Sequence, residues 1–196
     1  RIVPNPGNVA LPQTNVTWCA GWMKTAADGG SSTNNIFFMH ALLGRYTLDP
    51  KIFKCPADKY RDALTGQEYP RSVTMNMWMA FPLNGTVGWQ GYRQFYRDTE
   101  MNQPSELFVF IHEDPTTIED GVYRLNMDTA VPPGPPPLVF ENRPAALHNR
   151  STSIGFADGR SELHRWENTG NLGGVTVATG SAADVLWLKS NATERK

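Results

Sequence analysis

The chain has 196 residues, of which 40% are hydrophobic and 19% charged, and its formal net charge is −1. The sequence has no run of basic residues of the kind that binds nucleic acids, and none of its apolar runs reaches the 18 residues needed to cross a membrane. Its 17 glycines and 15 prolines favour short strands joined by turns over a helical bundle, within a single globular domain over residues 1–196.

The first part of the chain is predicted to contain little regular structure. Residues 1–35 form an irregular, turn-rich segment, and the apolar spacing over residues 33–46 predicts a short helix that ends at Gly44. The side chains expected on one face of that helix are Ile36, Met39, His40 and Leu43.

Three strands are predicted in the middle of the chain, over residues 72–81, 106–113 and 121–127. The second is apolar on both faces, so we expect it in the centre of a sheet, and the third should pair nearby. The strand period of two places Leu107, Val109 and Ile111 on one face and Phe108 and Phe110 on the other.

A hairpin is predicted near the C-terminal end, because Asp158-Gly159 lies between alternating strands over residues 152–157 and 160–166. The proline-rich stretch 131–139 should be a surface loop.

A short terminal helix is predicted over residues 181–189, where Ser181 and Asp184 stand in capping-box register. Together these elements indicate an α+β fold, an antiparallel sheet with a few short helices.

The two cysteines, Cys19 and Cys55, allow two interpretations. A disulfide, which we expect, would close a loop rich in Gly, Ser and Asn, contribute roughly 3–4 kcal/mol and indicate an oxidising compartment. The alternative is a pair of buried free thiols. The sequence has no CxxC pair and no nearby histidine cluster typical of a zinc site.

Four acidic residues lie close together in the stretch IHEDPTTIEDGVY, and two interpretations stay open for them. Oxygen ligands on a loop suit calcium, although the spacing does not match an EF-hand. The other interpretation is a solvated turn. The residues concerned are Glu113, Asp114, Glu119 and Asp120.

His148, Asp158 and His164 are the residues that suggest catalysis or a metal site in the hairpin region. A hydrolase would need at least one more converging acid or histidine, so we expect no catalysis from them. The sequence also contains no GxSxG, HExxH, P-loop or GxGxxG motif.

The same region resembles a known family. His148, nine intervening residues and then Asp158-Gly159 match the His-x9-Asp-Gly signature near the C-terminus of many bacterial prepilin-like proteins, which resemble the pseudopilins of type II secretion systems. Further stretches similar to that family follow in the same order: WCAGW (18–22), DPKIFKCPADK (49–59), RSVTMN (71–76), PSELFVFIHEDPTTIEDG (104–121), FADGRSELHRW (156–166) and DVLWLK (184–189).

The resemblance implies a structural role. Such proteins carry a short basic leader and then an apolar helix of about twenty residues, which anchors them in the inner membrane and later packs in a filament core. This chain resembles the head domain that follows the helix. We therefore expect a subunit of a type II secretion or type IV pilus-like filament that acts by assembly and requires no catalysis and no cofactor.

The resemblance also implies partners and a location. The partners would be other pseudopilin-like subunits and secretion-system components, with membrane contact only through the preceding helix. The location would be extracytoplasmic, in the periplasm or at the cell surface. The major pseudopilin of type II secretion binds calcium in a C-terminal loop, which keeps calcium open as a ligand.

An alternative function is a secreted or surface-anchored binding module, for instance for carbohydrate. Aromatic side chains in a loop-rich sheet protein can form stacking platforms, whereas buried aromatics are simply core residues. The tryptophans to consider are Trp18, Trp22, Trp78 and Trp89.

Overall fold

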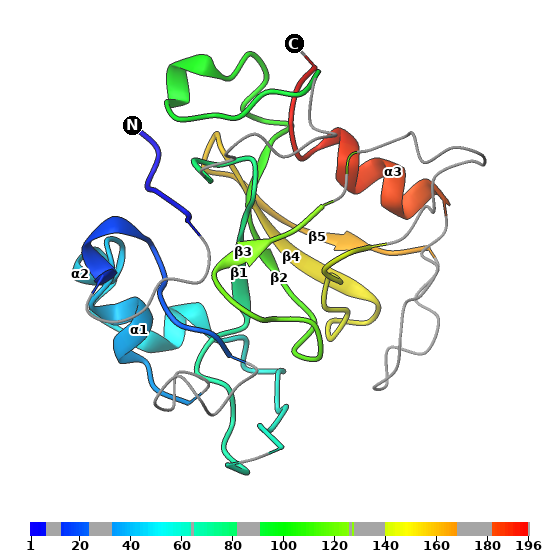
Figure 1. Ribbon diagram of the computed structural model, residues 1–196. Coiled ribbons are helices and arrows are strands. Elements are labelled where there is room, and N and C mark those ends of the chain that lie inside the picture. The colour runs from blue at the N-terminus through cyan, green and yellow to red at the C-terminus, as the bar shows by residue number, and fades with distance from the viewer. Residues whose placement is uncertain are drawn as a thin grey trace, which may run out of the picture.

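A five-stranded sheet forms the centre of the computed structural model (Figure 1). The structure describes residues 1–6, 13–23, 33–63, 65–81, 91–125, 127, 140–167 and 182–195. The strands are β1 (Val73–Asn76), β2 (Phe108–His112), β3 (Val122–Tyr123), β4 (Ser151–Phe156) and β5 (Ser161–Arg165), in the order β3-β1-β2-β4-β5.

Short helices surround the sheet. The α-helices are α1 (Ile36–Met39), α2 (Gly44–Thr47) and α3 (Ala182–Ser190), and the 3-10 helices cover Gln13–Val16, Pro50–Phe53 and Asp98–Glu100. None of the helices in the described residues is long and apolar enough to span a membrane. These elements confirm the α+β class.

The sheet is mixed, which corrects the prediction of a purely antiparallel one. β2 is central as predicted and pairs antiparallel with both β1 and β4, but β3 pairs parallel with β1. β1 and β4 occupy both edges of β2, and the chain that leaves β2 joins the sheet as β3 at the outer edge of β1.

A β-bulge changes which side chains of β2 share a face. The register between β2 and β4 shifts between Phe108 and Phe110, so Phe108 and Ile111 enter the same cluster although they are three positions apart. Val109 and Phe110 contact the opposite cluster. The predicted alternation therefore holds through Val109 and is wrong from Phe110 onward, because a bulge inserts one residue into the strand period.

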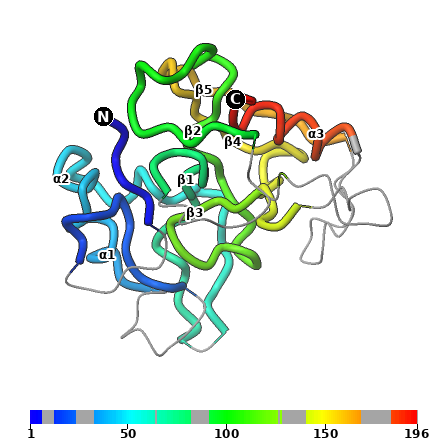
Figure 2. Tube along the Cα trace, turned by 45° about the horizontal axis from the view of Figure 1, so that its top comes forward, coloured from blue at the N-terminus to red at the C-terminus, as the bar shows by residue number. Residues whose placement is uncertain are grey.

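Two hydrophobic clusters cover the two faces of the sheet, and Figures 1 and 2 show the helices on opposite sides of it. One cluster joins Ile111 and Ile154 to Val185 and Leu188 of α3. The other joins the other face to the N-terminal part of the chain, with members that include Trp18, Phe38, Phe53 and Met75. The irregular N-terminal segment thus contributes to the core, and Trp18 is fully buried there.

The helix expected over residues 33–46 is instead two short helices, α1 and α2. Gly44 begins α2 and does not end the first helix. A Cβ on Gly44 would lie 2.0 Å from the carbonyl oxygen of Met39, so only glycine fits this close approach. The buried residues are Phe37, Phe38 and Ala41. Of the expected face, Met39 and Leu43 pack against the core in part, Ile36 is half-buried, and His40 is exposed.

The hairpin β4–β5 confirms the prediction made from Asp158-Gly159. The N–H of Gly159 donates to the carbonyl of Phe156, and the φ of Gly159 is 91°. This is typical of a type I turn followed by a glycine bulge, in which residues 157–159 lie between the hydrogen-bonded Phe156 and Arg160. Asp158 supports it by accepting a hydrogen bond from the N–H of Arg160 (3.0 Å).

The terminal helix α3 also confirms its prediction. Asp184 accepts a hydrogen bond from the N–H of Glu167 (2.9 Å), which ties the helix to the end of the hairpin. The cap residue Ser181, the proline-rich stretch 131–139 and Trp89 lie outside the described residues.

Candidate functional site

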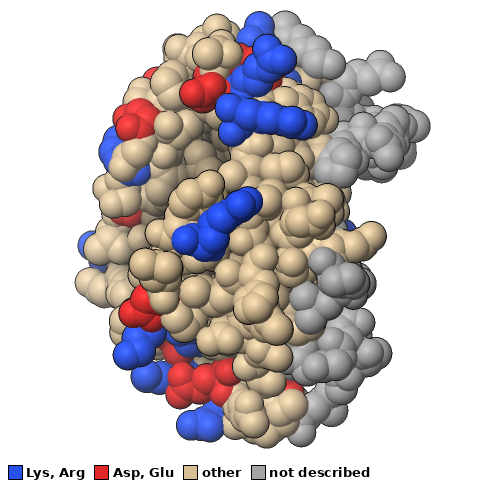
Figure 3. Space-filling model, turned by 90° about the vertical axis from the view of Figure 1, so that its left-hand side faces the viewer, with Lys and Arg blue, Asp and Glu red and all other residues tan. Residues whose placement is uncertain are grey.

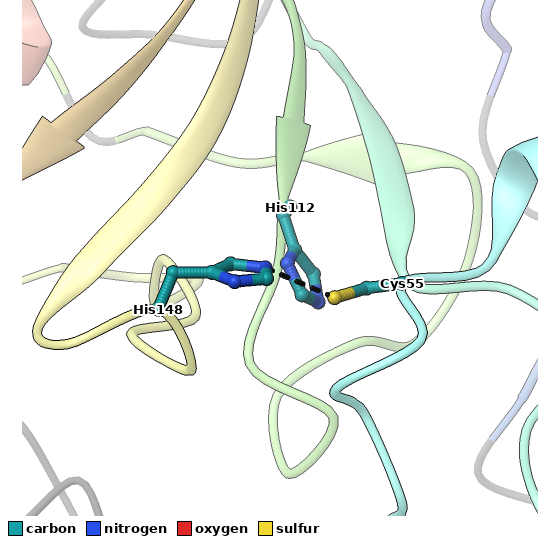
Figure 4. A group of neighbouring side chains, drawn as sticks. All are labelled: Cys55, His112 and His148. Carbon is teal, nitrogen blue, oxygen red and sulfur yellow. Dashed lines mark hydrogen bonds between the residues drawn. The ribbon is translucent and has the colours of Figure 1, made fainter.

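Three side chains from distant parts of the chain meet at one end of the sheet: Cys55, His112 and His148 (Figure 4). One ligand atom from each lies within 4.8 Å of the others. The Sγ of Cys55 and the Nε2 of His148 are 3.1 Å apart and form a hydrogen bond whose direction depends on the histidine tautomer. The rings of His112 and His148 lie 6.2 Å apart, centre to centre.

Cys55 is held by a tight turn that follows the 3-10 helix Pro50–Phe53. The N–H of Asp58 donates to the carbonyl of Cys55 (3.0 Å), with Pro56 at the second position, where its fixed φ favours a turn. The N–H of Cys55 donates to the hydroxyl of Ser72 (3.2 Å), and that hydroxyl donates to the carboxylate of Asp58 (2.6 Å). The backbone at Cys55 is therefore fixed to the start of β1.

Asp58 also neutralises a lysine of this loop. Its side chain is almost fully buried and forms an ion pair with Lys54 at 2.8 Å. A buried carboxylate is stable only when it is paired and hydrogen-bonded, as Asp58 is here.

His112 is the last residue of the central strand β2 and is 2% exposed. Burial lowers the pKa of His112 to about 4, with the charge of Asp58 opposing this shift and that of His148 adding to it. The imidazole is therefore neutral near pH 7. Within the described residues, its buried Nε2 has no hydrogen-bond partner.

His148 stands at a two-residue turn before β4. The N–H and carbonyl of His148 both bond to Ser151, at 3.4 and 3.1 Å, and Asn149 and Arg150 between them have positive φ. Positive φ at both central residues defines a type I′ turn. The hydroxyl of Thr152 donates to the carbonyl of Ala145 and holds the approach to this turn.

The imidazole of His148 is directed at Cys55.

The three groups line an open pocket of about 320 Å³, together with residues that include Ile52, Phe110 and Ser153. A thiol beside an imidazole can act as a nucleophile, and a thiolate with two imidazoles can bind a transition metal. The second imidazole distinguishes this arrangement from a simple Cys–His pair.

The predicted disulfide between Cys19 and Cys55 is not formed, and both thiols are free. Cys19 is buried in the cluster around Trp18, where its Sγ lies 3.5 Å from the carbonyl of Ala20. Burial raises the pKa of the Cys19 thiol. Cys55 instead faces His148, so the two sulfur atoms occupy different environments.

The four acidic residues proposed for calcium have separate structural roles. Glu113 is fully buried and accepts hydrogen bonds from Asn142 and from Thr117, and burial raises its pKa to about 8. Asp114 accepts hydrogen bonds from the N–H and hydroxyl of Thr116 in a local turn.

The other two acids lie at the end of the same connection. Asp120 accepts a hydrogen bond from the N–H of Val122 (2.8 Å), and burial raises its pKa. Glu119 uses its carbonyl to accept from the N–H of Met23. Within the described residues, the group of three or more potential ligands is Cys55, His112 and His148, and no carboxylate belongs to it.

The residues considered for catalysis do not converge. His148 and Asp158 lie beyond opposite ends of β4, and His164 stacks on the ring of Trp187 at 3.5 Å. The aromatic platform is not formed by Trp18 or Trp78 either, because both are buried in the core.

The candidate site was missed in the sequence because its members are far apart in the chain and follow no metal-ligand spacing. Two local signals could have indicated it: a histidine at the end of the most apolar strand, and a cysteine in a Cys-Pro-x-Asp turn.

No family model, curated protein or solved structure matches this chain.

Proposed function

We propose that this chain is the head domain of a pseudopilin-like subunit, which acts by assembling into an extracytoplasmic filament of the type II secretion or type IV pilus kind. The motif resemblance suggests the class. The observation that carries the assembly role is a group of exposed apolar side chains on a side of the molecule with few charges.

The exposed group, here called the α2 surface, consists of Tyr46, Leu48 and Ile52, which are 76, 85 and 59% exposed. Figure 3 views the side of the molecule on which α2 lies; most of this side is uncharged, with one basic residue near its middle and the other charged residues mainly towards its ends. Large apolar side chains that are adjacent and exposed are typical of a protein–protein contact.

A second feature agrees with an apolar helix before Arg1. The first residues of the chain lie beside a hollow of about 320 Å³ whose lining includes Ile2, Pro4, Val16 and Ala80. The N–H of Ile2 donates to the carbonyl of Tyr96 (2.9 Å), which fixes the chain at this point. In the proposed subunit, the outer half of the helix packs against this hollow.

The location outside the cytoplasm depends on the resemblance alone, since the free thiols provide no disulfide to support it. The partners in this proposal are further copies of the subunit and other components of the same secretion or pilus system. The calcium proposal has no support from the geometry of the acidic turn.

The test is to express the chain from its gene with the residues encoded before Arg1, and to analyse membranes and sheared filaments. We expect processing by a prepilin peptidase, an apolar helix in the mature protein and recovery in the filament fraction. The variant Leu48→Asn should lower that recovery. The control Leu163→Asn alters a residue of β5 that is 62% exposed and should leave it unchanged.

A conventional secretory signal with no apolar helix in the mature protein would contradict the proposal. So would equal filament recovery of the Leu48→Asn and wild-type proteins.

A further inference from the structure

We propose that Cys55, His112 and His148 form a binding site for a divalent transition metal of the zinc class, with a fourth coordination position open to the adjoining pocket. This inference does not rest on the filament role, although Ile52 of the α2 surface also lines the adjoining pocket.

The donor set fits such an ion. Zinc takes thiolate sulfur and imidazole nitrogen in tetrahedral sites, and three protein ligands with one open position is a common arrangement. Oxygen-loving calcium and magnesium are disfavoured, because no carboxylate belongs to the group within the described residues.

The geometry is close to that of a formed site. Metal–sulfur and metal–nitrogen bonds of about 2.3 and 2.0 Å in a tetrahedron place sulfur and nitrogen about 3.5 Å apart. The Cys55 Sγ to His148 Nε2 distance is 3.1 Å, and all three ligand atoms lie within 4.8 Å. In a formed site the separations that now reach up to 4.8 Å would shorten to about 3.5 Å.

The free Nε2 of His112 is the independent observation that points to a ligand. A buried polar atom without a hydrogen-bond partner is unfavourable, and within the described residues this nitrogen has none. A metal ion between the three side chains would satisfy it.

The surroundings hold the site in place and give access to it. Cys55 is fixed through Ser72 and Asp58, and His148 is fixed by its turn with Ser151. The charged groups near His112 are Lys54, Asp58 and Asp114, and Lys54 is neutralised by its ion pair with Asp58. All three ligands line the open pocket, so an ion can enter from solvent.

The ion would connect three segments that are distant in sequence: the turn after the 3-10 helix Pro50–Phe53, the end of β2 and the turn before β4. Metal binding would therefore stabilise the folded state, since the unfolded chain does not hold these ligands together.

The test uses the 196-residue protein after treatment with a chelator and removal of the chelator. Zn²⁺ is titrated in competition with a coloured indicator, and Co²⁺ is added separately as a spectroscopic probe. We expect one ion per chain, a higher melting temperature with Zn²⁺, and a sulfur-to-cobalt charge-transfer band in the Co²⁺ spectrum.

Matched variants locate the site. Cys55→Ser should abolish the charge-transfer band, and Cys55→Ser and His148→Asn should each weaken Zn²⁺ binding by at least about tenfold. His40→Asn is the control, because His40 is exposed and lies outside the group. Circular dichroism checks that each variant is folded, and His148, which is only partly buried, provides a second variant should Cys55→Ser fold poorly.

Zinc should also protect Cys55 from alkylation by iodoacetamide. The proposal is overturned if folded wild-type protein does not bind Zn²⁺ stoichiometrically, if the Co²⁺ band survives in Cys55→Ser, or if His40→Asn weakens binding as much as His148→Asn.

Discussion

Replacing Leu48 by glycine should stabilise the isolated domain and weaken its assembly at the same time. Leu48 follows α2 with a φ of 59° and is 85% exposed. A non-glycine residue in the left-handed region costs about 1–2 kcal/mol, whereas the added flexibility of glycine in the unfolded chain costs about 0.5–1 kcal/mol. The side chain contributes little packing because it is mostly exposed.

The net gain for Leu48→Gly is therefore about 0.5–1 kcal/mol, which corresponds to a rise of about 1–4 °C in the melting temperature of a domain of this size. Thermal unfolding followed by circular dichroism measures this gain, and recovery in sheared filaments measures assembly. A lower melting temperature would refute the assignment of strain to Leu48. A rise in melting temperature with undiminished filament recovery would refute the role of the α2 surface.

Three further predictions concern stability. The pKa of Glu113 is raised to about 8, so the folded state keeps a proton that the unfolded state releases. The unfolding free energy of chelator-treated protein should therefore fall by about 2 kcal/mol from about pH 6.5 to 8. Glu113→Gln should remove this slope in urea titrations; an unchanged slope would contradict the assignment. Gly159→Ala should lower the free energy of unfolding by about 1–2 kcal/mol, because the φ of Gly159 is 91°. The added Cβ would meet no atom within 4 Å, so backbone strain alone causes this loss. An unchanged free energy in urea unfolding would argue against this turn geometry. Ile111→Ala, in the core, should lower the free energy of unfolding by about 2–5 kcal/mol. Leu186→Ala, at a position 54% exposed, should lower it by well under 1 kcal/mol. Equal losses for the two variants would contradict the burial of Ile111.

Local patterns predicted the elements whose signals lie within a few residues. The hairpin followed from Asp158-Gly159 between alternating runs, and α3 from its apolar residues near the C-terminal end. The central position of β2 followed from apolar side chains on both of its faces. In each case the sequence near the element is enough, because the turn or the burial is determined locally.

Features that depend on distant contacts were not predictable in the same way. The parallel pairing of β3 with β1 and the bulge where β2 pairs with β4 both depend on strands that are distant in the sequence. The expected disulfide was wrong because loop length alone does not say which way each thiol points. Cys55 was visible in the sequence, but its partners His112 and His148 became neighbours only through the sheet.

The His-x9-Asp-Gly spacing now has a structural explanation that separates its two ends. The type I′ turn at His148, the strand β4 and the turn at Asp158-Gly159 follow one another with no residue to spare. Because side chains alternate along a strand, one inserted residue in β4 would move Ile154 from the core to the other face or carry His148 away from Cys55. The number of residues between His148 and Asp158 is therefore set by the length of β4. At one end of that strand the requirement is a backbone conformation, supplied by Gly159, and at the other it is an imidazole directed at a thiol.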